Sequence, residues 1–292
     1  MRGNAAEHDL VAPGSLTAVL DLIASSPGQW TPIAGGTELM VAFAAGRLSA
    51  SKLVSLWGVQ ELRFIESRPD EVVIGAGTTF SDLRADAMIA FEFPLLDKAS
   101  SWIGAIANQT RATLGGNLVN GSPAADSSPA LLVYDAEVEL VSVRGKRRMP
   151  YCGFHTGYKQ NAMTADELML AVHLPRRFSQ HRQYLRKVGT RRAMAISKVA
   201  LGATARWKDG VIEEVRVAAA SLAPFPARLR NTEAELSGKT VNDDVIASAR
   251  RCLLAEAQPI DDIRSNAQYR KYVGANLLEE FLVSLMAEQG AR

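Results

Sequence analysis

The sequence predicts an α+β protein of more than one domain. The chain has 292 residues, enough for two or three domains of ordinary size, each with its own core. From about Gln180 onward, long alternating strands are followed by two or three helices, which is the order expected of a separate α+β domain. Before that point, short strands and helices alternate around two Gly-Gly pairs. We therefore expect a larger N-terminal part and a smaller C-terminal domain, divided within Arg176–Gln180.

The composition excludes several function classes. Hydrophobic residues make up 47% of the chain, and 33 Lys and Arg stand against 31 Asp and Glu. A net charge of +2 is too balanced for a general nucleic-acid or membrane surface, so we interpret the short basic clusters as solvated faces and turns. Only two cysteines are present, Cys152 and Cys252, which excludes an iron–sulfur cluster or a Cys-rich zinc site held by this chain alone. No signal-peptide pattern or membrane-length apolar stretch is present, and we expect a cytoplasmic protein.

Residues 1–56 are expected to form a small first subdomain. Its apolar residues recur first at helical spacing and then in short β-rich runs. The expected elements are a helix from Leu16 to Ile23 with Ser15 as N-cap, a strand over Gln29–Ala34, a helix over Glu38–Ala45 stopped by Gly46, and a strand over Lys52–Leu56.

Residues 57–178 are expected to form a second subdomain. Arg68-Pro69-Asp70 separates two β-rich runs, which is a hairpin signal. The run GAGTTF at Gly75–Phe80 lacks the third glycine of a dinucleotide-binding fingerprint, so we expect a tight strand-to-helix turn with Ser81 as N-cap. The expected elements are strands over Arg63–Glu66, Glu71–Gly75, Glu137–Val143 and Asp166–Leu174, and a helix over Pro94–Ala107.

Residues 179–292 carry the pattern of a sheet followed by helices. Asp209-Gly210 is a strong two-residue hairpin signal between two of the strands. The expected strands are His181–Val188, Val199–Trp207 and Val211–Ala219, and the expected helices are Pro226–Ser237, Asp243–Glu256 and Ser265–Glu288. The last helix carries an apolar stripe that we interpret as core, made of Tyr272, Val273, Leu277, Phe281, Leu285 and Met286.

Two glycine-rich segments, Ile33–Met40 and Thr113–Pro129, are the strongest functional signal. Glycine in such runs marks backbone that approaches something closely or takes a positive φ. In the first segment, the N–H groups of Gly36, Thr37 and Glu38 would point out of the N-terminus of the following helix, and such an end attracts anions. We predict that both segments close on one phosphate-containing ligand. For either Gly-Gly pair taken alone, the alternative is that the glycines only form a turn.

With both segments in view, the chain closely resembles the FAD-binding (medium) subunit of the molybdenum hydroxylases, the family of bacterial xanthine dehydrogenase, carbon monoxide dehydrogenase and nicotine dehydrogenase. AGGTELM at Ala34–Met40 is similar to the family's AGGTDLM loop, and TLGGNLVNGSPAADSSPALL at Thr113–Leu132 is similar to its TIGGNL loop. The resemblance continues through KVGTRRAMAIS (Lys187–Ser197), APFPARL (Ala223–Leu229) and IRSNAQYRKYV (Ile263–Val273). Five motifs in family order cover nearly the whole chain.

The resemblance implies a two-subdomain α+β FAD-binding module over residues 1–178, followed by a smaller α+β C-terminal domain over 179–292. It also implies that both glycine segments hold the FAD pyrophosphate through backbone N–H groups. Asp126 matches an aspartate that bonds the ribityl chain, Lys187 a lysine near the flavin N1–C2 carbonyl edge, and Met169 a leucine against the isoalloxazine. The implied cofactor-binding residues are Ile33, Ala34, Gly35, Gly36, Thr37, Glu38, Leu39, Thr113, Gly115, Gly116, Asn117, Ser122, Asp126, Met169 and Lys187.

Taken without the resemblance, some of these residues allow another interpretation. Asp126 could cap the short helix after it, and Lys187 could be an ordinary strand lysine. No Ser-His-Asp or Cys-His nucleophile system and no acid/base carboxylate pair is present, so we expect no catalytic residue of those kinds. The four histidines, His8, His155, His173 and His181, are scattered and are interpreted as structural or surface residues, with no metal.

The resemblance implies an FAD-dependent oxidoreductase subunit that is active within a complex. In the family, the substrate is oxidised at a molybdenum cofactor on a large subunit, and electrons pass through two [2Fe–2S] clusters on a small subunit. They then reach this flavin and leave to NAD⁺, a quinone or another acceptor. The protein's task is to bind, orient and tune the flavin. A stand-alone flavin oxidoreductase and a binding module that has lost its flavin are the alternatives.

Overall fold

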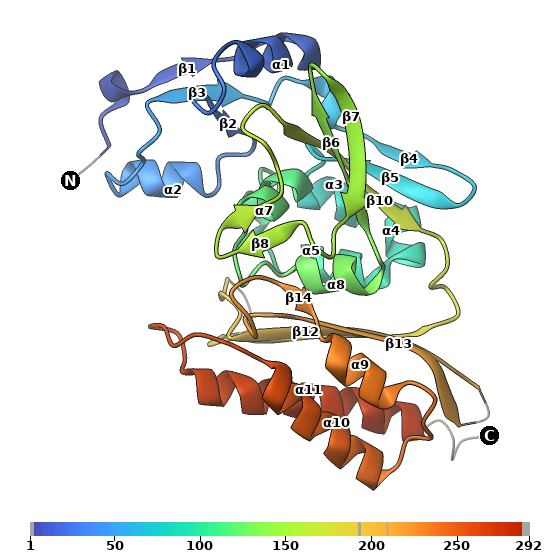
Figure 1. The fold of residues 1–292 in the computed structure, drawn as a ribbon. Coiled ribbons are helices and arrows are strands. Elements are labelled where there is room, and N and C mark those ends of the chain that lie inside the picture. The colour runs from blue at the N-terminus through green and yellow to red at the C-terminus, as the bar shows by residue number, and fades with distance from the viewer. Residues whose placement is uncertain (1–2, 192–193, 209, 288–292) are drawn as a thin grey trace.

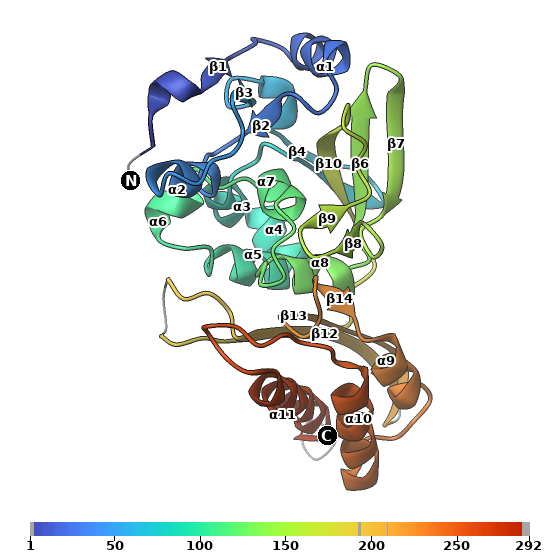
Figure 2. The same cartoon turned by 60° about the vertical axis from the view of Figure 1, so that its left-hand side comes forward.

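The computed structural model describes residues 3–191, 194–208 and 210–287. Figure 1 shows three layers one above another: a small N-terminal sheet, a middle region of sheet and helices, and a C-terminal sheet covered by helices on its outer face. The turned view in Figure 2 shows the same order of layers. The predicted α+β class is confirmed.

The first layer is a three-stranded parallel sheet with two helices. Its elements are β1 (Asp9–Val11), α1 (Leu16–Ser25), β2 (Thr31–Ile33), α2 (Leu39–Ala44) and β3 (Lys52–Ser55), and the strand order is β1-β3-β2. The hydroxyl of Ser15 caps α1 by accepting a hydrogen bond from the Ala18 N–H at 3.2 Å, as the sequence predicts. Helix α2 ends before Gly46, whose φ of +64° favours glycine.

The middle layer contains a five-stranded antiparallel sheet. Its strands are β4 (Ile65–Ser67), β5 (Glu71–Gly75), β6 (Glu137–Ser142), β7 (Gly145–Pro150) and β10 (Leu168–Pro175), in the order β4-β5-β10-β6-β7. The predicted β4–β5 hairpin is confirmed. The central strand β10 is buried on both faces, because Leu168 and Leu170 pack in a core with α1 while Met169 and Val172 pack in a core with the helices. Burial on both faces explains why its sequence is apolar except for His173.

Helices fill the space between the middle and C-terminal sheets. They are α3 (Phe80–Ala85), α4 (Ala87–Glu92), α5 (Pro94–Ser100), α6 (Ile106–Gln109), α7 (Leu114–Val119) and α8 (Ser128–Val133), and a small hairpin of β8 (His155–Gly157) and β9 (Gln160–Asn161) lies beside them. The turn after β5 is a strand-to-helix turn as predicted, but its N-cap is Thr79, not Ser81. Thr79 and Asp82 form a reciprocal capping box, which satisfies two backbone N–H groups at once.

The single helix predicted over Pro94–Ala107 is wrong. Helix α5 ends at Ser100, and Gly104 takes a φ of +53°, which a continuing helix cannot accommodate. A new helix then begins at Ile106, where the Asn108 side chain accepts a hydrogen bond from the Ala105 N–H at 3.0 Å.

The C-terminal layer is a four-stranded antiparallel sheet with three helices on its outer face. Its elements are β11 (Arg182–Val188), β12 (Val199–Lys208), β13 (Val211–Ala220), β14 (Ala227–Arg228), α9 (Arg230–Leu236), α10 (Asp243–Glu256) and α11 (Ala267–Ala287), with strand order β11-β12-β13-β14. The predicted hairpin between β12 and β13 is present; Gly210 has a φ of +82°, and Asp209 lies outside the described residues. The inner face of the sheet meets α8, since a Cβ on Gly202 would lie 3.2 Å from Pro129.

Two helix predictions in this layer need correction. Residues from Pro226 to Arg228 are not helical, because Ala227 and Arg228 pair with β13 and only then does α9 begin. Tyr272 does not belong to the core stripe of α11: it is 52% exposed, whereas Leu277, Phe281 and Leu285 are buried as predicted. The position Glu288 lies outside the described residues.

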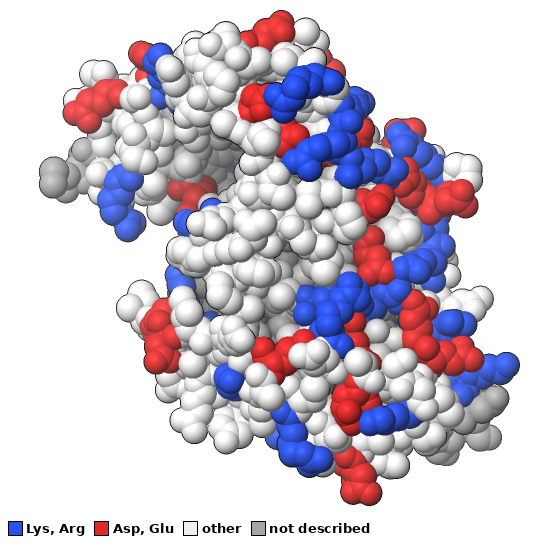
Figure 3. Space-filling model, viewed as in Figure 1, with Lys and Arg blue, Asp and Glu red and all other residues white. Residues whose placement is uncertain are grey.

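The charged surface agrees with the interpretation of the basic clusters as solvated faces. Figure 3 shows acidic and basic side chains interleaved, with a gathering of Lys and Arg over the edge strand β7. Each basic residue there is paired with an acid, as in Arg147 with Glu167 and Arg148 with Glu71. Charged side chains on an edge strand also discourage pairing with another chain. No helix among the described residues has the length and apolar composition needed to cross a membrane.

Candidate functional site

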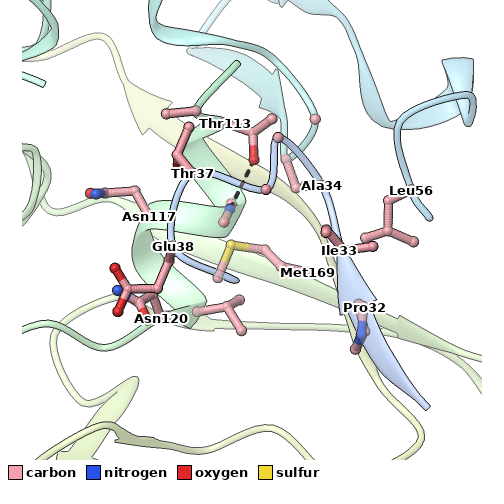
Figure 4. A pocket seen from close by; sticks show the side chains of 18 of the residues that line it. Pro32, Ile33, Ala34, Thr37, Glu38, Leu56, Thr113, Asn117, Asn120 and Met169 are labelled. Atoms are coloured by element: carbon pink, nitrogen blue, oxygen red, sulfur yellow. Dashed lines mark hydrogen bonds between the residues drawn. The ribbon is translucent and has the colours of Figure 1, made fainter. Parts of the chain in front are cut away.

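A cavity of about 400 Å³ lies where the first layer meets the middle layer, and both glycine segments line it. The first segment enters as the loop between β2 and α2, and the second forms the start of α7 (Figure 4). Met169 of β10 also lines the cavity. The two segments therefore line one cavity, as a shared ligand requires, and a phosphate-containing ligand there stays a prediction.

Most of the predicted site residues line this cavity, and three do not. Those that line it are Ile33, Ala34, Gly35, Gly36, Thr37, Glu38, Leu39, Thr113, Gly115, Gly116, Asn117 and Met169. The other three, Ser122, Asp126 and Lys187, lie elsewhere in the fold. Sequence reasoning missed several lining residues, among them Asn120, Leu56, Leu62 and Ile103. Asn120 follows Asn117 by one helical turn and could have been found by that spacing; the apolar residues carry no chemical signal.

The glycines permit backbone segments to touch. A Cβ on Gly35 would lie 1.6 Å from the carbonyl oxygen of Arg111, so the loop rests directly on the chain that leads into α7. A Cβ on Gly115 would lie 2.5 Å from the Cβ of Ala76, at the end of the β5 turn. The absence of a Cβ at both positions therefore lets three segments converge at one end of the cavity.

The backbone N–H groups of the two segments differ in their hydrogen bonding. The Gly115 N–H donates to the Ala76 carbonyl at 2.9 Å, and the Gly116 N–H donates to the Thr113 hydroxyl at 3.1 Å, the bond drawn in Figure 4. Among the described residues, the N–H groups of Gly36, Thr37 and Glu38 donate to no protein acceptor. The first segment thus offers three consecutive N–H donors without a protein acceptor beside the cavity, and such donors can bind an anion.

Asp126 and Lys187 form a buried ion pair. The Lys187 ammonium lies 2.5 Å from one Asp126 oxygen and donates to the Trp102 carbonyl at 3.4 Å, while the Ser197 hydroxyl donates to the other Asp126 oxygen. Burial raises the pKa of Asp126, and the adjacent Lys187 charge opposes that shift. The pair joins the loop before α8 to strand β11 of the C-terminal layer.

The surroundings of Asp126 and Lys187 differ from those of a capping aspartate and an ordinary strand lysine. Helix α8 has Ser127 as N-cap and no side-chain cap, so the capping role for Asp126 is wrong. The Lys187 side chain is only 12% exposed and is paired, unlike an ordinary lysine on a solvated strand face. The Ser122 hydroxyl accepts a hydrogen bond from the Ala124 N–H at 3.3 Å, within the loop after α7.

The histidines take part in local structure. His155 lies 3.1 Å from the Tyr151 hydroxyl, His173 lies between Glu71 and Glu139, and His181 contacts Glu214. Burial lowers the pKa of His155 and of His181. Within the described part of the chain, no three His, Cys, Asp or Glu side chains gather as a metal site.

Comparisons with known proteins agree along the whole chain. Residues 6–177 match the family model described as "FAD binding domain in molybdopterin dehydrogenase", and residues 184–285 match the "CO dehydrogenase flavoprotein C-terminal domain". A xanthine dehydrogenase FAD-binding subunit of Escherichia coli O157:H7 is 29% identical over 280 residues, covering 95% of this chain and 96% of that one. A carbon monoxide dehydrogenase medium chain of Hydrogenophaga pseudoflava is 24% identical over 271 residues, covering 93% and 94%.

A solved structure has the same fold. It is the carbon monoxide dehydrogenase from Hydrogenophaga pseudoflava that lacks the Mo-pyranopterin moiety of its molybdenum cofactor. The likeness has a TM-score of 0.90 at 24% sequence identity and covers 94% of this chain and 95% of that one. At this identity the likeness establishes the fold.

Proposed function

Since the chain belongs to the family of FAD-binding domains in molybdopterin dehydrogenases, we propose that it takes electrons from [2Fe–2S] clusters of a partner chain and passes them to an external acceptor such as NAD⁺ or a quinone. The chain is the FAD-binding oxidoreductase subunit of a molybdenum hydroxylase, and its cofactor is FAD. The proposal concerns the donor, the acceptor and the residues that hold the cofactor.

The cavity is the observation that carries the proposal. Its residues fit a dinucleotide, because one end offers three unpaired N–H donors at Gly36, Thr37 and Glu38 and the rest is largely apolar. Gly36 has a φ of +76°, which turns the chain so that these donors follow one another along one loop. An anionic pyrophosphate supplies acceptors for such donors, and flat aromatic rings suit apolar walls.

We assign the residues the following roles. The first glycine segment binds the pyrophosphate through its N–H groups, and the second segment, with Gly116 and Asn117, forms the facing wall. Met169 packs against a flavin ring. The roles proposed for Asp126 at the ribityl chain and for Lys187 at the isoalloxazine edge rest on the family resemblance, because neither residue lines the cavity. Bound FAD supplies the redox chemistry, since a flavin can exchange electrons both with one-electron clusters and with two-electron acceptors.

We further propose the assembly and the domain limits. The partners are a large subunit with a molybdenum cofactor and a small subunit with two [2Fe–2S] clusters; the related protein named as a medium chain supports this assembly. The FAD-binding domain spans residues 1–178, with subdomains 1–56 and 57–178, and the C-terminal domain spans 179–292. A cytoplasmic location, supported by two unpaired cysteines, completes the proposal.

Purification from the encoding organism tests this function. A tag on this chain should recover chains that contain molybdenum and iron together with FAD in the visible spectrum. After anaerobic reduction of the complex by its organic substrate, the flavin band should return on addition of NAD⁺ or a quinone. Recovery of this chain alone with full dehydrogenase activity would instead support the stand-alone oxidoreductase.

A further inference from the structure

The charges around the cavity do not match the anion that the proposed function places there. Of the described residues that line it, Glu38 alone carries a charge at neutral pH, and that charge is negative. A pyrophosphate brings two further negative charges next to this carboxylate. Backbone N–H groups contribute only partial positive charge, so a nearby cation would offset the repulsion and strengthen binding.

Lys159 is the cation that the fold places beside this carboxylate. Its ammonium lies 3.4 Å from a Glu38 oxygen, although the two residues are 121 positions apart in the chain. Lys159 stands in the turn between β8 and β9 with a φ of +52°, a backbone conformation that is uncommon for lysine.

The turn that carries Lys159 is fixed to the cavity wall. A Cβ on Gly121 would lie 3.1 Å from the Cα of Lys159, and the Asn161 amide donates to the Val119 carbonyl at 3.3 Å. Gly121 and Val119 are at the end of α7, the helix whose first turn contains Gly115 and Gly116. The position of Lys159 relative to the glycine segments is therefore set by contacts that do not involve Glu38.

Arg111, another cation near the first segment, is already engaged. The Arg111 guanidinium lies 3.7 Å from the centre of the Trp57 ring, and its Nε donates to the Gly35 carbonyl at 3.4 Å. By contrast, the Lys159 and Glu38 side chains are 47% and 58% exposed, and an ion pair so exposed contributes little. Lys159 can exchange Glu38 for a phosphate oxygen at little cost.

We propose that Lys159 is a cofactor-binding residue whose ammonium supplies the counter-charge for the FAD pyrophosphate at the mouth of the cavity and leaves Glu38 when the cofactor binds. The inference rests on the proposed function of this cavity. It assigns Lys159 and Glu38 opposite effects on affinity, because one attracts the diphosphate and the other repels it.

Titration of FAD-free protein with FAD, followed by flavin fluorescence, tests the assignment. Lys159→Met should raise the dissociation constant about tenfold, as expected for losing one contact between charged groups, and should make the affinity less sensitive to salt. Glu38→Gln should lower the dissociation constant. Lys146→Met is the matched control, since Lys146 is also an exposed, ion-paired lysine, 60% exposed and 3.9 Å from Glu139, but its partner Glu139 does not line the cavity, whereas Glu38 does. It should bind FAD like the wild type.

A second substitution separates binding from folding. Lys159→Asn removes the charge but suits the left-handed backbone, so it should weaken FAD binding as much as Lys159→Met without lowering the melting temperature of the FAD-free protein. Equal FAD affinity in Lys159→Met and Lys146→Met would overturn the proposal. Weaker FAD binding in Glu38→Gln would also overturn the proposal, because it would show that the ion pair stabilises the structure that binds FAD. If wild-type protein binds no FAD, the proposed function itself fails along with this inference.

Discussion

Replacing Gly35 with alanine is expected to remove tight FAD binding from a protein that still folds. The new Cβ would lie 1.6 Å from the carbonyl oxygen of Arg111, and real Cβ contacts essentially never fall below 3.0 Å. The loop and the chain before α7 must therefore move apart by about 1.4 Å. The two atoms closest to the new Cβ are the carbonyl oxygen and carbonyl carbon of Arg111. Because both belong to the backbone, no side-chain rotation can relieve the contact.

The size of the effect follows from the donors on this loop. A separation of about 1.4 Å is enough to break hydrogen bonds between the N–H groups of Gly36, Thr37 and Glu38 and an anion. Hydrogen bonds to a charged group are worth about 1.5–3 kcal/mol each. Losing two at the lower value costs about 3 kcal/mol, which raises the dissociation constant about 150-fold. Overpacking should lower the free energy of unfolding by about 1–3 kcal/mol, which a typical domain survives.

Fluorescence titration with FAD and thermal unfolding of the FAD-free protein measure the two effects separately. Gly58→Ala is the matched control, because a Cβ there meets nothing within 4 Å and adds the same methyl group. It should bind FAD like the wild type. A Gly35→Ala protein whose dissociation constant stays within threefold of the wild-type value would refute the reasoning, because the loop would then not hold the pyrophosphate.

Three further outcomes are expected. Lys187 is proposed to lie near the flavin. In Lys187→Met, loss of its ammonium, with the Asp126 charge left in place, should then lower the two-electron midpoint potential by about 30–60 mV in a dye-coupled titration; an unchanged or higher potential would place Lys187 away from the flavin. Asp135 pairs with Arg177, Arg216 and Arg228. In Asp135→Ala these arginines lose their shared partner, and the free energy of unfolding in urea should fall by about 2–3 kcal/mol. An unchanged free energy of unfolding would mean that these ion pairs do not hold the layers together. The hydrogen bond from Arg147 lowers the pKa of Glu167. The stability that ionised Glu167 contributes is therefore complete above the ordinary glutamate pKa of about 4.3 and is lost as the pH falls below that value. The difference in melting temperature between wild type and Glu167→Gln should narrow toward acid pH, and a constant difference would contradict this.

Local signals in the sequence were sufficient for many elements. The Ser15 cap, the β4–β5 hairpin and the helix over Asp243–Glu256 were predicted correctly, because each depends on residues close together in the chain. The convergence of the two glycine segments was also predicted. Two Gly-Gly pairs with neighbouring hydroxyls made a shared ligand site more probable than two unrelated turns.

Elements that depend on distant contacts were predicted less well. The residues from Pro226 to Arg228 join a sheet because β13 offers them an edge, and nothing within the local sequence shows that edge. Tyr272 lies on the solvent side of α11 because Leu278 and Leu282 take the core positions, and the apolar pattern alone allowed either rotation. The Asp126–Lys187 pair likewise joins residues 61 positions apart.

The two glycine pairs look alike in sequence but meet different physical requirements. In the second pair, the Gly115 N–H is bonded to Ala76, and a Cβ on Gly115 would strike the same residue, so this glycine is required for packing between α7 and the β5 turn. In the first pair, Gly36 combines a positive φ with an N–H that has no protein acceptor among the described residues, as expected of backbone kept available for a ligand. The hydrogen-bond partner of Gly115, Ala76, lies far from it in the chain, so the local sequence does not distinguish the two pairs. Both pairs therefore contain a glycine required for a close contact, Gly35 and Gly115, and the unpaired N–H of Gly36 is what supports the proposed ligand-binding role of the first loop.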